Sequence, residues 1–303
     1  GQAEAIPHYR MPNEEVLADL YRFRELDVTF NLGVKAGADL TPQKLLAEGY
    51  RAVYLAVGAS KPSSPNVPGE QLPGVIYALD FLLDANQGKF PKLGQKIVVV
   101  GGGDVAIDSV RSAVRLSPGA TVSMVYRRTK AEAPCGPEEI HEAEPEGVQF
   151  YWLLSPVKIL GTDRIEGMVF QKMELAPPDA SGRRAVVAIP NAFETIECDT
   201  VIMAIGQVAD LDGFPADLQL KIGSKGWPEG VHPDTMTAVE GVFASGGKSV
   251  VHAMAAGTRA AESIDAYLRK KEGLAPLPRP DPFGGPVPPP RAPEGYSGPV
   301  WRP

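Results

Sequence analysis

Apolar runs of strand length alternate along this chain with segments of helical period. The runs that predict buried strands are Tyr50–Ser60, Lys96–Gly103, Thr121–Tyr126 and Cys198–Gly206. Between the second and the third run, apolar side chains recur with the 3.6-residue period of a helix that packs on a sheet. These positions are Ala106, Ile107, Val110, Ala113 and Val114. The succession of strand, helix and strand predicts an α/β fold with a parallel sheet.

Further elements are predicted on either side of this unit. Apolar spacing predicts helices at Asn13–Leu26, Tyr77–Ala85 and Val250–Lys270, and a short strand at Asp27–Val34. From Val148 to Ile189 we expect short strands with turns at GTDR and PPDASG. From Gly273 onward the chain is rich in proline and has no helical period. This tail is predicted either to dock on a protein surface, as Tyr296 and Trp301 favour, or to stay disordered.

Composition and charge exclude several classes of function. A net charge of −7 and a pI near 5.3 disfavour nucleic acid as a partner, because nucleic acids are bound by basic faces. No apolar run reaches the roughly 20 residues of a membrane-spanning helix. The N-terminal segment lacks the apolar core of a signal peptide, so we expect a cytoplasmic protein.

The cysteines and histidines predict neither a metal site nor a redox-active dithiol. Cys135 and Cys198 form no C-x-x-C pair, and two reduced thiols are expected. An iron–sulfur cluster normally needs four thiolates, so this chain is not expected to hold one alone. The four histidines show no metal-ligand spacing and are expected to be surface or core residues. For His252, near the start of a predicted helix, a position facing a ligand is the alternative.

The glycines after the second run match a dinucleotide-binding turn. Gly101-x-Gly103-x-x-Ala106 follows a predicted strand and opens a predicted helix. The first glycine permits the tight turn, the second lets a pyrophosphate approach the backbone, and Ala106 lets helix and strand pack closely. A purely structural turn is the alternative. The cofactor-binding residues predicted here are Gly101, Gly102, Gly103, Asp104 and Val105.

The end of the next predicted strand indicates which dinucleotide is bound. A site that prefers NAD places Asp or Glu there, about 20 residues after the glycines, to bind the ribose hydroxyls. Here the strand ends in VYRRTK, so Arg127 and Arg128 occupy that place. Guanidinium groups pair with a phosphate, which predicts NADP(H) rather than NAD(H). Two solvated surface arginines are the alternative.

Several longer motifs, in order along residues 5–270, extend this interpretation. They are IPHYRMP, DLTPQKLLAEGYRAVYLAVGA, VVVGGGDVAIDSVR, VYRRTKAEAPCGPEEIHEAEPEGVQF, DTVIMAIGQ and GVFASGG with VVHAMAAGTRAAESI. In these motifs the chain resembles the small (beta) subunit of NADPH-dependent glutamate synthase and its relatives among the FAD/NAD(P)-linked oxidoreductases. The third motif, for example, resembles that family's VIGGGNTAMDAAR.

The resemblance implies two nucleotide-binding domains, with a Rossmann-like NADP(H) domain inserted into an incomplete FAD-binding domain. The implied division is residues 1–60 and 206–271 for the FAD-type parts, 61–205 for the NADP(H) domain, and 272–303 for the proline-rich tail. The implied cofactors are NADP(H) and FAD, and the implied partner is a protein that carries iron–sulfur clusters or completes the flavin site. Beyond the first turn, the implied cofactor-binding residues are Arg127, Arg128, Ala204, Ile205, Gly206, Gly246 and Gly247.

Two departures from the family pattern leave two functions open. The first FAD-binding βαβ unit, which precedes the IPHYRMP-like segment in the family, is not in this sequence. The family's GVFAAGD reads GVFASGG here, with Gly247 in place of an aspartate that binds flavin. One function is an electron-input component that passes hydride from NADPH to a flavin. The other is a flavin-less NADP(H)-binding module with a role in regulation or assembly. No catalytic acid or base is predicted, because the cofactors carry the chemistry.

Overall fold

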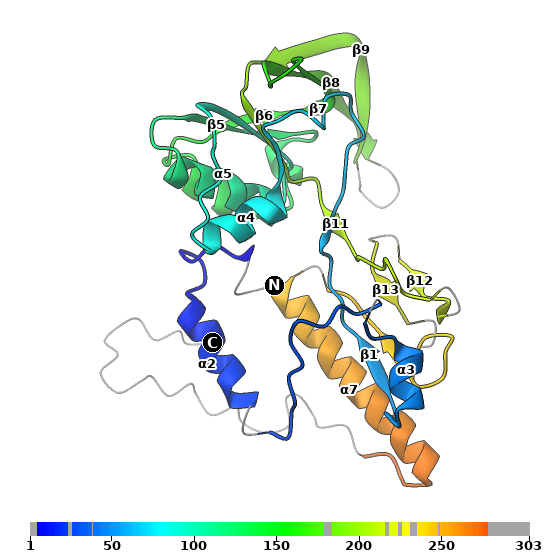
Figure 1. The fold of residues 1–303 in the computed structure, drawn as a ribbon. Coiled ribbons are helices and arrows are strands. Elements are labelled where there is room, and N and C mark those ends of the chain that lie inside the picture. Colours follow the sequence, from blue (N-terminus) through cyan, green and yellow to red (C-terminus); the bar gives the residue numbers. More distant parts are fainter. Residues whose placement is uncertain are drawn as a thin grey trace, which may run out of the picture.

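The computed structural model describes residues 5–23, 26–37, 39–178, 184–215, 218–223, 226–230, 235–247 and 249–277. Its elements form two groups (Figure 1): a parallel sheet with its helices and an antiparallel sheet, and a smaller group around β1 and α7. His232, most of the PPDASG turn and the tail with Tyr296 and Trp301 lie outside the described residues, so those predictions are not tested.

A five-stranded parallel sheet forms the centre of the larger group, as the sequence predicts. Its strand order is β3 (Val75–Tyr77), β10 (Thr200–Met203), β4 (Lys96–Val100), β5 (Thr121–Tyr126) and β6 (Gln149–Trp152). Ile97 to Val100 are at most 3% exposed, the continuous burial expected of a parallel strand covered on both faces.

Helices cover one face of this sheet. They are α4 (Ala78–Asn86), α5 (Asp104–Leu116) and α6 (Gly136–Ala143), with a short 3-10 turn at Lys130–Glu132 before α6. Ala106, Ile107, Val110 and Ala113 on α5 are fully buried, so the predicted helix face is confirmed. α5 follows β4 directly in the chain through a short turn, and it packs on the sheet beside α4 (Figure 1).

A three-stranded antiparallel sheet packs on the other face. It consists of β7 (Leu154–Leu160), β8 (Gly167–Pro178) and β9 (Arg184–Ile196), and the GTDR turn connects the first two. The prediction of short strands here was wrong, because β8 has 12 residues and β9 has 13. The two strands pair over nearly their whole length, and this pairing satisfies their backbone groups where the side chains face solvent.

The smaller group contains short strands and two helices. β1 (Val53–Leu55) pairs in parallel with β14 (Val242–Ala244), next to α3 (Pro42–Ala47) and the long α7 (Val250–Glu272). β12 (Lys221–Ile222) pairs with β13 (Pro228–Glu229). The chain leaves this group along β2 (Lys61–Pro62) and returns along β11 (Gln207–Val208), and these two strands pair with each other. The predicted domain limits stay a prediction.

Several predicted elements are shorter than expected, and one is absent. α2 runs over Asn13–Arg22 instead of reaching Leu26, and the runs at 50–60 and 198–206 form only the short β1 and β10. The strand predicted at Asp27–Val34 was wrong, since this segment pairs with no strand among the described residues. Its alternating apolar side chains stay exposed: Val28 by 47%, Phe30 by 53%, Leu32 by 87% and Val34 by 48%. A strand needs a partner to satisfy its backbone, and sequence alternation does not supply one.

Candidate functional site

The turn between β4 and α5 is held tightly at its first glycine. Gly101 has φ +152°, and its N–H donates to the carbonyl of Val125 at 3.0 Å. A Cβ at this position would lie 2.2 Å from the carbonyl oxygen of Ala204, at the end of β10. The close approach of these strand ends therefore requires glycine, as the motif predicts.

The other two glycines have opposite surroundings. A Cβ on Gly102 would lie 2.5 Å from the ring of Tyr126, which packs over the turn, and the carbonyl of Gly102 accepts the N–H of Cys135 at 3.2 Å. A Cβ on Gly103 would meet nothing within 4 Å. The backbone at Gly103 is therefore open on the side away from the protein, which is the space a phosphate needs.

The first turn of α5 adds a positive potential beside this open space. Gly103 caps the helix without a side-chain hydrogen bond, and among the described residues the N–H groups of Asp104 and Val105 have no acceptor. Such N–H groups and the helix dipole favour an anion at this end of the helix. Asp104 is exposed, and its carboxylate shares this end of the helix with any bound anion.

The two arginines lie at the adjacent strand end. Val100 and Val125 are neighbours in the register of β4 and β5, so Gly101 and Arg127 both follow the carboxyl ends of paired strands. In the described part of the chain neither Arg127 nor Arg128 forms an ion pair. Arg127 is exposed, whereas Arg128 donates to the carbonyl of Arg184 at 3.0 Å. The structure thus places two guanidinium groups beside the glycine turn, and among the described residues neither of them faces a carboxylate partner.

The predicted residues after β10 lie on the other side of the turn. Ala204 donates its N–H to Val100 at 2.8 Å, which fixes it next to Gly101. Ile205 and Gly206 follow it and are exposed, and the carbonyl of Gly206 accepts the N–H of Ser63 at 3.0 Å. Three neighbouring strand ends therefore converge here, the usual location of a ligand site in an open parallel sheet.

The last two predicted residues, Gly246 and Gly247, are not part of this cluster. They follow β14 in the smaller group, and both are closed by packing. A Cβ on Gly246 would lie 2.8 Å from the Cβ of Trp227, and one on Gly247 would lie 2.5 Å from the backbone nitrogen of Ala253. His252 is exposed, and its ring nitrogen Nδ1 is 2.7 Å from the hydroxyl of Ser249, the N-cap of α7.

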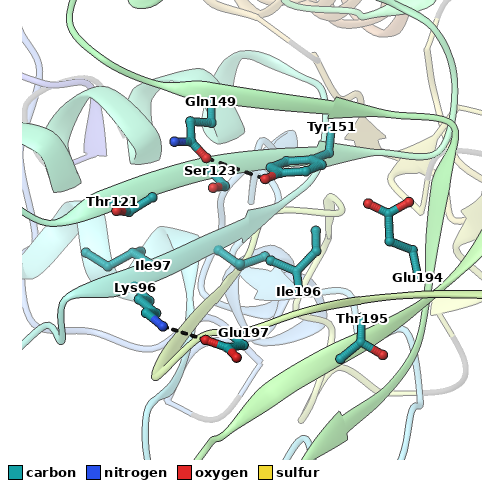
Figure 2. Close-up of a pocket in the computed structure, with 11 residues that line it drawn as sticks. Lys96, Ile97, Thr121, Ser123, Gln149, Tyr151, Glu194, Thr195, Ile196 and Glu197 are labelled. Carbon is teal, nitrogen blue, oxygen red and sulfur yellow. Dashed lines mark hydrogen bonds and ion pairs between the residues drawn. The ribbon is translucent and has the colours of Figure 1, made fainter.

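A groove of about 280 Å³ lies at the opposite edge of the parallel sheet (Figure 2). It is lined by residues at or near the amino ends of strands, among them Lys96, Thr121 and Gln149. Its charged wall is compensated internally, since Lys96 and Glu197 form an ion pair at 2.6 Å. The β4–α5 turn lies at the carboxyl ends of the strands, where ligands of parallel sheets bind, so this groove is distinct from the predicted nucleotide site.

Sequence reasoning missed a group of ion pairs next to α5. Arg10 pairs with Asp108 at 2.6 Å and with Glu139, and Arg111, only 8% exposed, pairs with acidic residues of α6 and the turn after it. Burial raises the pKa of Asp108 to about 6. The available signal was the presence of Asp108 and Arg111 inside a helix that is otherwise apolar toward the core.

The remaining chemistry-bearing residues give no further centre. Cys135 and Cys198 are unpaired and buried, and burial raises the pKa of these thiols to about 11 and about 12. Among the described residues no cluster of His, Cys, Asp and Glu has the makings of a metal site. Within the same residues, every helix is too short or too polar to cross a membrane.

Comparisons with known proteins agree with this fold. FprA from Mycobacterium tuberculosis, solved in complex with NADPH, superposes with a TM-score of 0.74 at 20% identity, covering 92% of this chain and 78% of that chain. Thioredoxin reductase from T. acidophilum superposes with a TM-score of 0.53 at 19% identity, covering 73% of this chain and 66% of that one. At such identities the likeness shows the fold alone.

Curated proteins found by sequence are more similar to this chain in identity than these solved structures are. The chain is 40% identical to the NADP(+)-dependent formate dehydrogenase subunit beta of Moorella thermoacetica, over 88% of this chain and 39% of that protein. It is 33% identical to the NADPH glutamate synthase small chain of Halomonas elongata, over 87% of this chain and 59% of that protein. It is 37% identical to the NADPH-Fe(3+) oxidoreductase subunit beta of Geobacter sulfurreducens, over 73% and 33%.

The chain thus spans between 33% and 59% of the length of these relatives. A family model for pyridine nucleotide-disulphide oxidoreductases matches residues 23–262, which include both groups of elements and the glycine turn. The resemblance inferred from the motifs is confirmed: this chain belongs to the pyridine nucleotide-disulphide oxidoreductase family and has the fold of that family.

Proposed function

We propose that this chain is the NADP(H)-binding, electron-input part of a larger oxidoreductase, in which electrons pass from NADPH through a flavin towards an iron–sulfur acceptor on another polypeptide. The observation that carries the nucleotide half is the open backbone at Gly103 beside the unpaired guanidinium of Arg127. The names of the relatives support a place in a larger enzyme, since they describe NADP-linked subunits or chains. The flavin and the iron–sulfur acceptor come from the resemblance in the motifs.

The described residues fit NADP(H) at the β4–α5 turn. The pyrophosphate would approach the open side of Gly103 and the free N–H groups at the start of α5. Arg127 and Arg128 would pair with the 2′-phosphate that distinguishes NADP(H) from NAD(H). The chain's part in the chemistry is to bind and orient the nicotinamide cofactor, which supplies the hydride itself.

The flavin half fits the described residues less well. A flavin, when bound, accepts a hydride and releases its electrons singly. The family's acidic residue for this group would stand at position 247, but a Cβ there would lie 2.5 Å from the backbone of Ala253. We therefore propose that a partner polypeptide completes the flavin site instead of these glycines.

Exposed apolar side chains support such a partner. Phe30 and Leu32 of the unpaired segment are 53% and 87% exposed, and Val251 and Met254 near the start of α7 are 74% and 68% exposed. Among the described residues, the β1–β14 sheet beside α7 has two strands and one further bridge, between Met236 and Phe243, and a sheet needs three or more strands to be stable by itself. Added strands from a partner would pair the segment at 27–34 and cover α7.

A flavin-less NADP(H)-binding module is the second candidate. The observation in its favour is again the closed position at Gly247, since a chain that never holds flavin needs no acidic residue there. The absorbance spectrum of the native complex separates the two candidates. Flavin bands that bleach on addition of NADPH support electron input, whereas NADPH binding without flavin in the purified complex supports the module.

Titration with NADPH and NADH tests the nucleotide site. Each charge-assisted hydrogen bond is worth about 1.5–3 kcal/mol, so we expect Arg127→Ala to weaken NADPH binding at least tenfold and to leave NADH binding unchanged. Arg164→Ala is the matched control, because Arg164 is also exposed and forms no ion pair among the described residues. Equal binding of NADPH and NADH by the wild type would refute the assignment.

A further inference from the structure

The segment at residues 6–12 contacts α4, α5 and α6, the helices that cover one face of the parallel sheet. The carbonyl of Ile6 accepts Asn86 Nδ2 of α4 at 2.8 Å, and Pro7 is buried. The N–H groups of Arg10 and Met11 donate back to Pro7 at 2.9 and 3.2 Å, which forms a compact turn. This turn connects α2 to the larger group of elements (Figure 1).

Two side chains of this turn engage α5. The ring of Tyr9 lies against Arg111 and Arg115, with its centroid 5.0 and 4.3 Å from their guanidinium carbons. Arg10 Nε lies 2.6 Å from Asp108 Oδ1, and the same guanidinium also pairs with Glu139 of α6. The Asp108 side chain is only 9% exposed, so Arg10 is the counter-charge that keeps an ionised carboxylate in this position.

Asp108 lies one helical turn after Asp104, about 6 Å further along the axis of the helix that begins at the nucleotide turn. An anion bound at that turn therefore meets a nearby carboxylate on the same helix. Without a compensating cation, the two negative charges repel through a partly buried, weakly screened environment. Arg10 and Arg111 supply that compensation in this structure.

We infer that Arg10 is a positioning residue for the nucleotide site, acting through Asp108 so that docking of residues 6–12 and binding of NADP(H) favour each other. This inference rests on the proposed function, since it takes NADP(H) as the anion. Coupling of this kind is reciprocal: docking of the segment strengthens nucleotide binding by the same factor as nucleotide binding strengthens docking.

Titration of Asp108 gives the inference a distinctive signature. The pKa of Asp108 is raised to about 6: burial raises it most, Glu139 and Asp104 also raise it, and Arg10 and Arg111 act in the opposite direction. On the sides of α5 that face α6 and residues 6–12, further charged or titratable groups are Tyr9, Arg115, Cys135, Glu142 and Glu146. α4 packs on α5 through apolar Phe81 and Leu82. Loss of Arg10 raises the pKa of Asp108 and leaves its carboxylate to repel the bound anion. This repulsion disappears as the pH falls, because Asp108 then takes up a proton.

The test measures NADPH dissociation constants for the full chain at pH 5.5 and 7.5, expressed as variant over wild type so that titration of the cofactor's own phosphate cancels. We expect Arg10→Ala to weaken binding about tenfold at pH 7.5, within the range of typical site-to-site coupling, and less than threefold at pH 5.5. Arg10→Lys keeps the charge and should stay within about threefold of wild type at both values. Arg10→Ala in an Asp108→Asn background should show no pH dependence in this ratio.

Arg51→Ala is the matched control, because it breaks an exposed arginine–carboxylate pair with Glu272, at 2.5 Å, at the far end of α7. A ratio near one for Arg10→Ala at both pH values would overturn the inference and leave the proposed function intact. A loss equal at both pH values, which Arg10→Lys does not restore, would show a structural role and overturn it too. If the wild type binds no NADPH, the proposed function falls first and the inference with it.

Hydrogen exchange in the absence of nucleotide gives a second readout. Arg10→Ala should speed amide exchange in residues 6–12 and leave the core strand β4 protected, which shows that the variant is folded. Addition of NADPH to the wild type should slow exchange in the same residues. Unchanged exchange there on NADPH binding would contradict the reciprocal coupling.

Discussion

Replacing Gly101 by alanine is the sharpest test of how the glycine turn is built. The added Cβ would lie 2.2 Å from the carbonyl oxygen of Ala204 and 2.8 Å from its carbonyl carbon. Neither backbone is free to move, because the N–H of Ala204 donates to Val100 at 2.8 Å in the middle of the sheet. Overpacking of this kind costs about 1–3 kcal/mol, and a positive φ costs a residue with a Cβ about 1–2 kcal/mol more.

Gly101→Ala should therefore lower the free energy of unfolding by about 2–5 kcal/mol. Urea denaturation followed by circular dichroism measures this loss, and with an m-value of about 3 kcal/mol/M the midpoint falls by about 0.7–1.7 M. Gly103→Ala is the matched control in the same turn, because its Cβ would meet nothing within 4 Å and its φ is −98°. It should cost less than about 1 kcal/mol of stability and yet weaken NADPH binding, since the methyl group fills the approach to the backbone.

Two results would refute this reasoning. If the free energy of unfolding of Gly101→Ala lies within 1 kcal/mol of that of the wild type, the ends of β4 and β10 are not held together as the structure shows. If Gly103→Ala binds NADPH as the wild type does, the open side of that glycine is not where the cofactor lies.

Three further predictions follow from burial and charge. Hydrogen bonds from Arg115 and Arg111 lower the pKa of Glu146 to about 2. The ionised Glu146 therefore stabilises the fold fully above the ordinary pKa of a glutamate, and this stabilisation is lost as the pH falls towards 2. Glu146→Gln should accordingly reduce the fall of the urea midpoint between pH 5 and pH 2.5. The buried thiols of Cys135 and Cys198 should resist an aromatic disulfide reagent at pH 8 until urea unfolds the chain, and labelling of either at the rate of free cysteine would contradict their burial. Leu32→Asp should change the stability of the isolated chain by no more than about 0.5 kcal/mol, since Leu32 is 87% exposed, and should abolish assembly with the proposed partner in size-exclusion chromatography.

The parts of the fold that the sequence predicts best are those whose pattern is settled by immediate neighbours. The strand at Thr121–Tyr126 has the predicted limits, and the apolar face of α5 is buried as predicted. Both lie inside one strand–helix–strand unit, where each apolar position faces either the sheet or the helix above it. Nothing from a distant part of the chain is needed to decide their conformation.

The predictions that were wrong depend on a partner that lies elsewhere. The segment Asp27–Val34 has the alternation of a strand, but no described strand lies beside it, and it stays extended and exposed. β8 and β9 are longer than predicted because each provides the other's hydrogen bonds far beyond the covered face of the sheet. Pairing is a long-range property, and a local pattern predicts the tendency to pair without the partner.

In the candidate site too, the sequence predicts what depends on neighbouring residues and misses what depends on distant ones. The glycine spacing and the place of Arg127 are local signals, and the parallel register of β4 and β5 then brings the two together. The contact between Arg10 and Asp108 joins residues nearly a hundred positions apart, and its sequence signal is only an acidic residue in a helix that faces a core. Composition and periodicity do not show which arginine forms an ion pair with which carboxylate.

The two glycine turns of this chain show why a motif needs its surroundings. Gly101-x-Gly103 and Gly246-Gly247 each end a buried strand and lead into a helix, so the sequence treats them alike. In the structure, a Cβ added to Gly103 would face open space. A Cβ added to Gly246 or to Gly247 would lie within 3 Å of atoms of Trp227 or Ala253. Glycine leaves open space in the first turn and permits close packing in the second. The distinction rests on where a Cβ would point, and it is the reason we propose the β4–α5 turn, and not the turn after β14, as the nucleotide site.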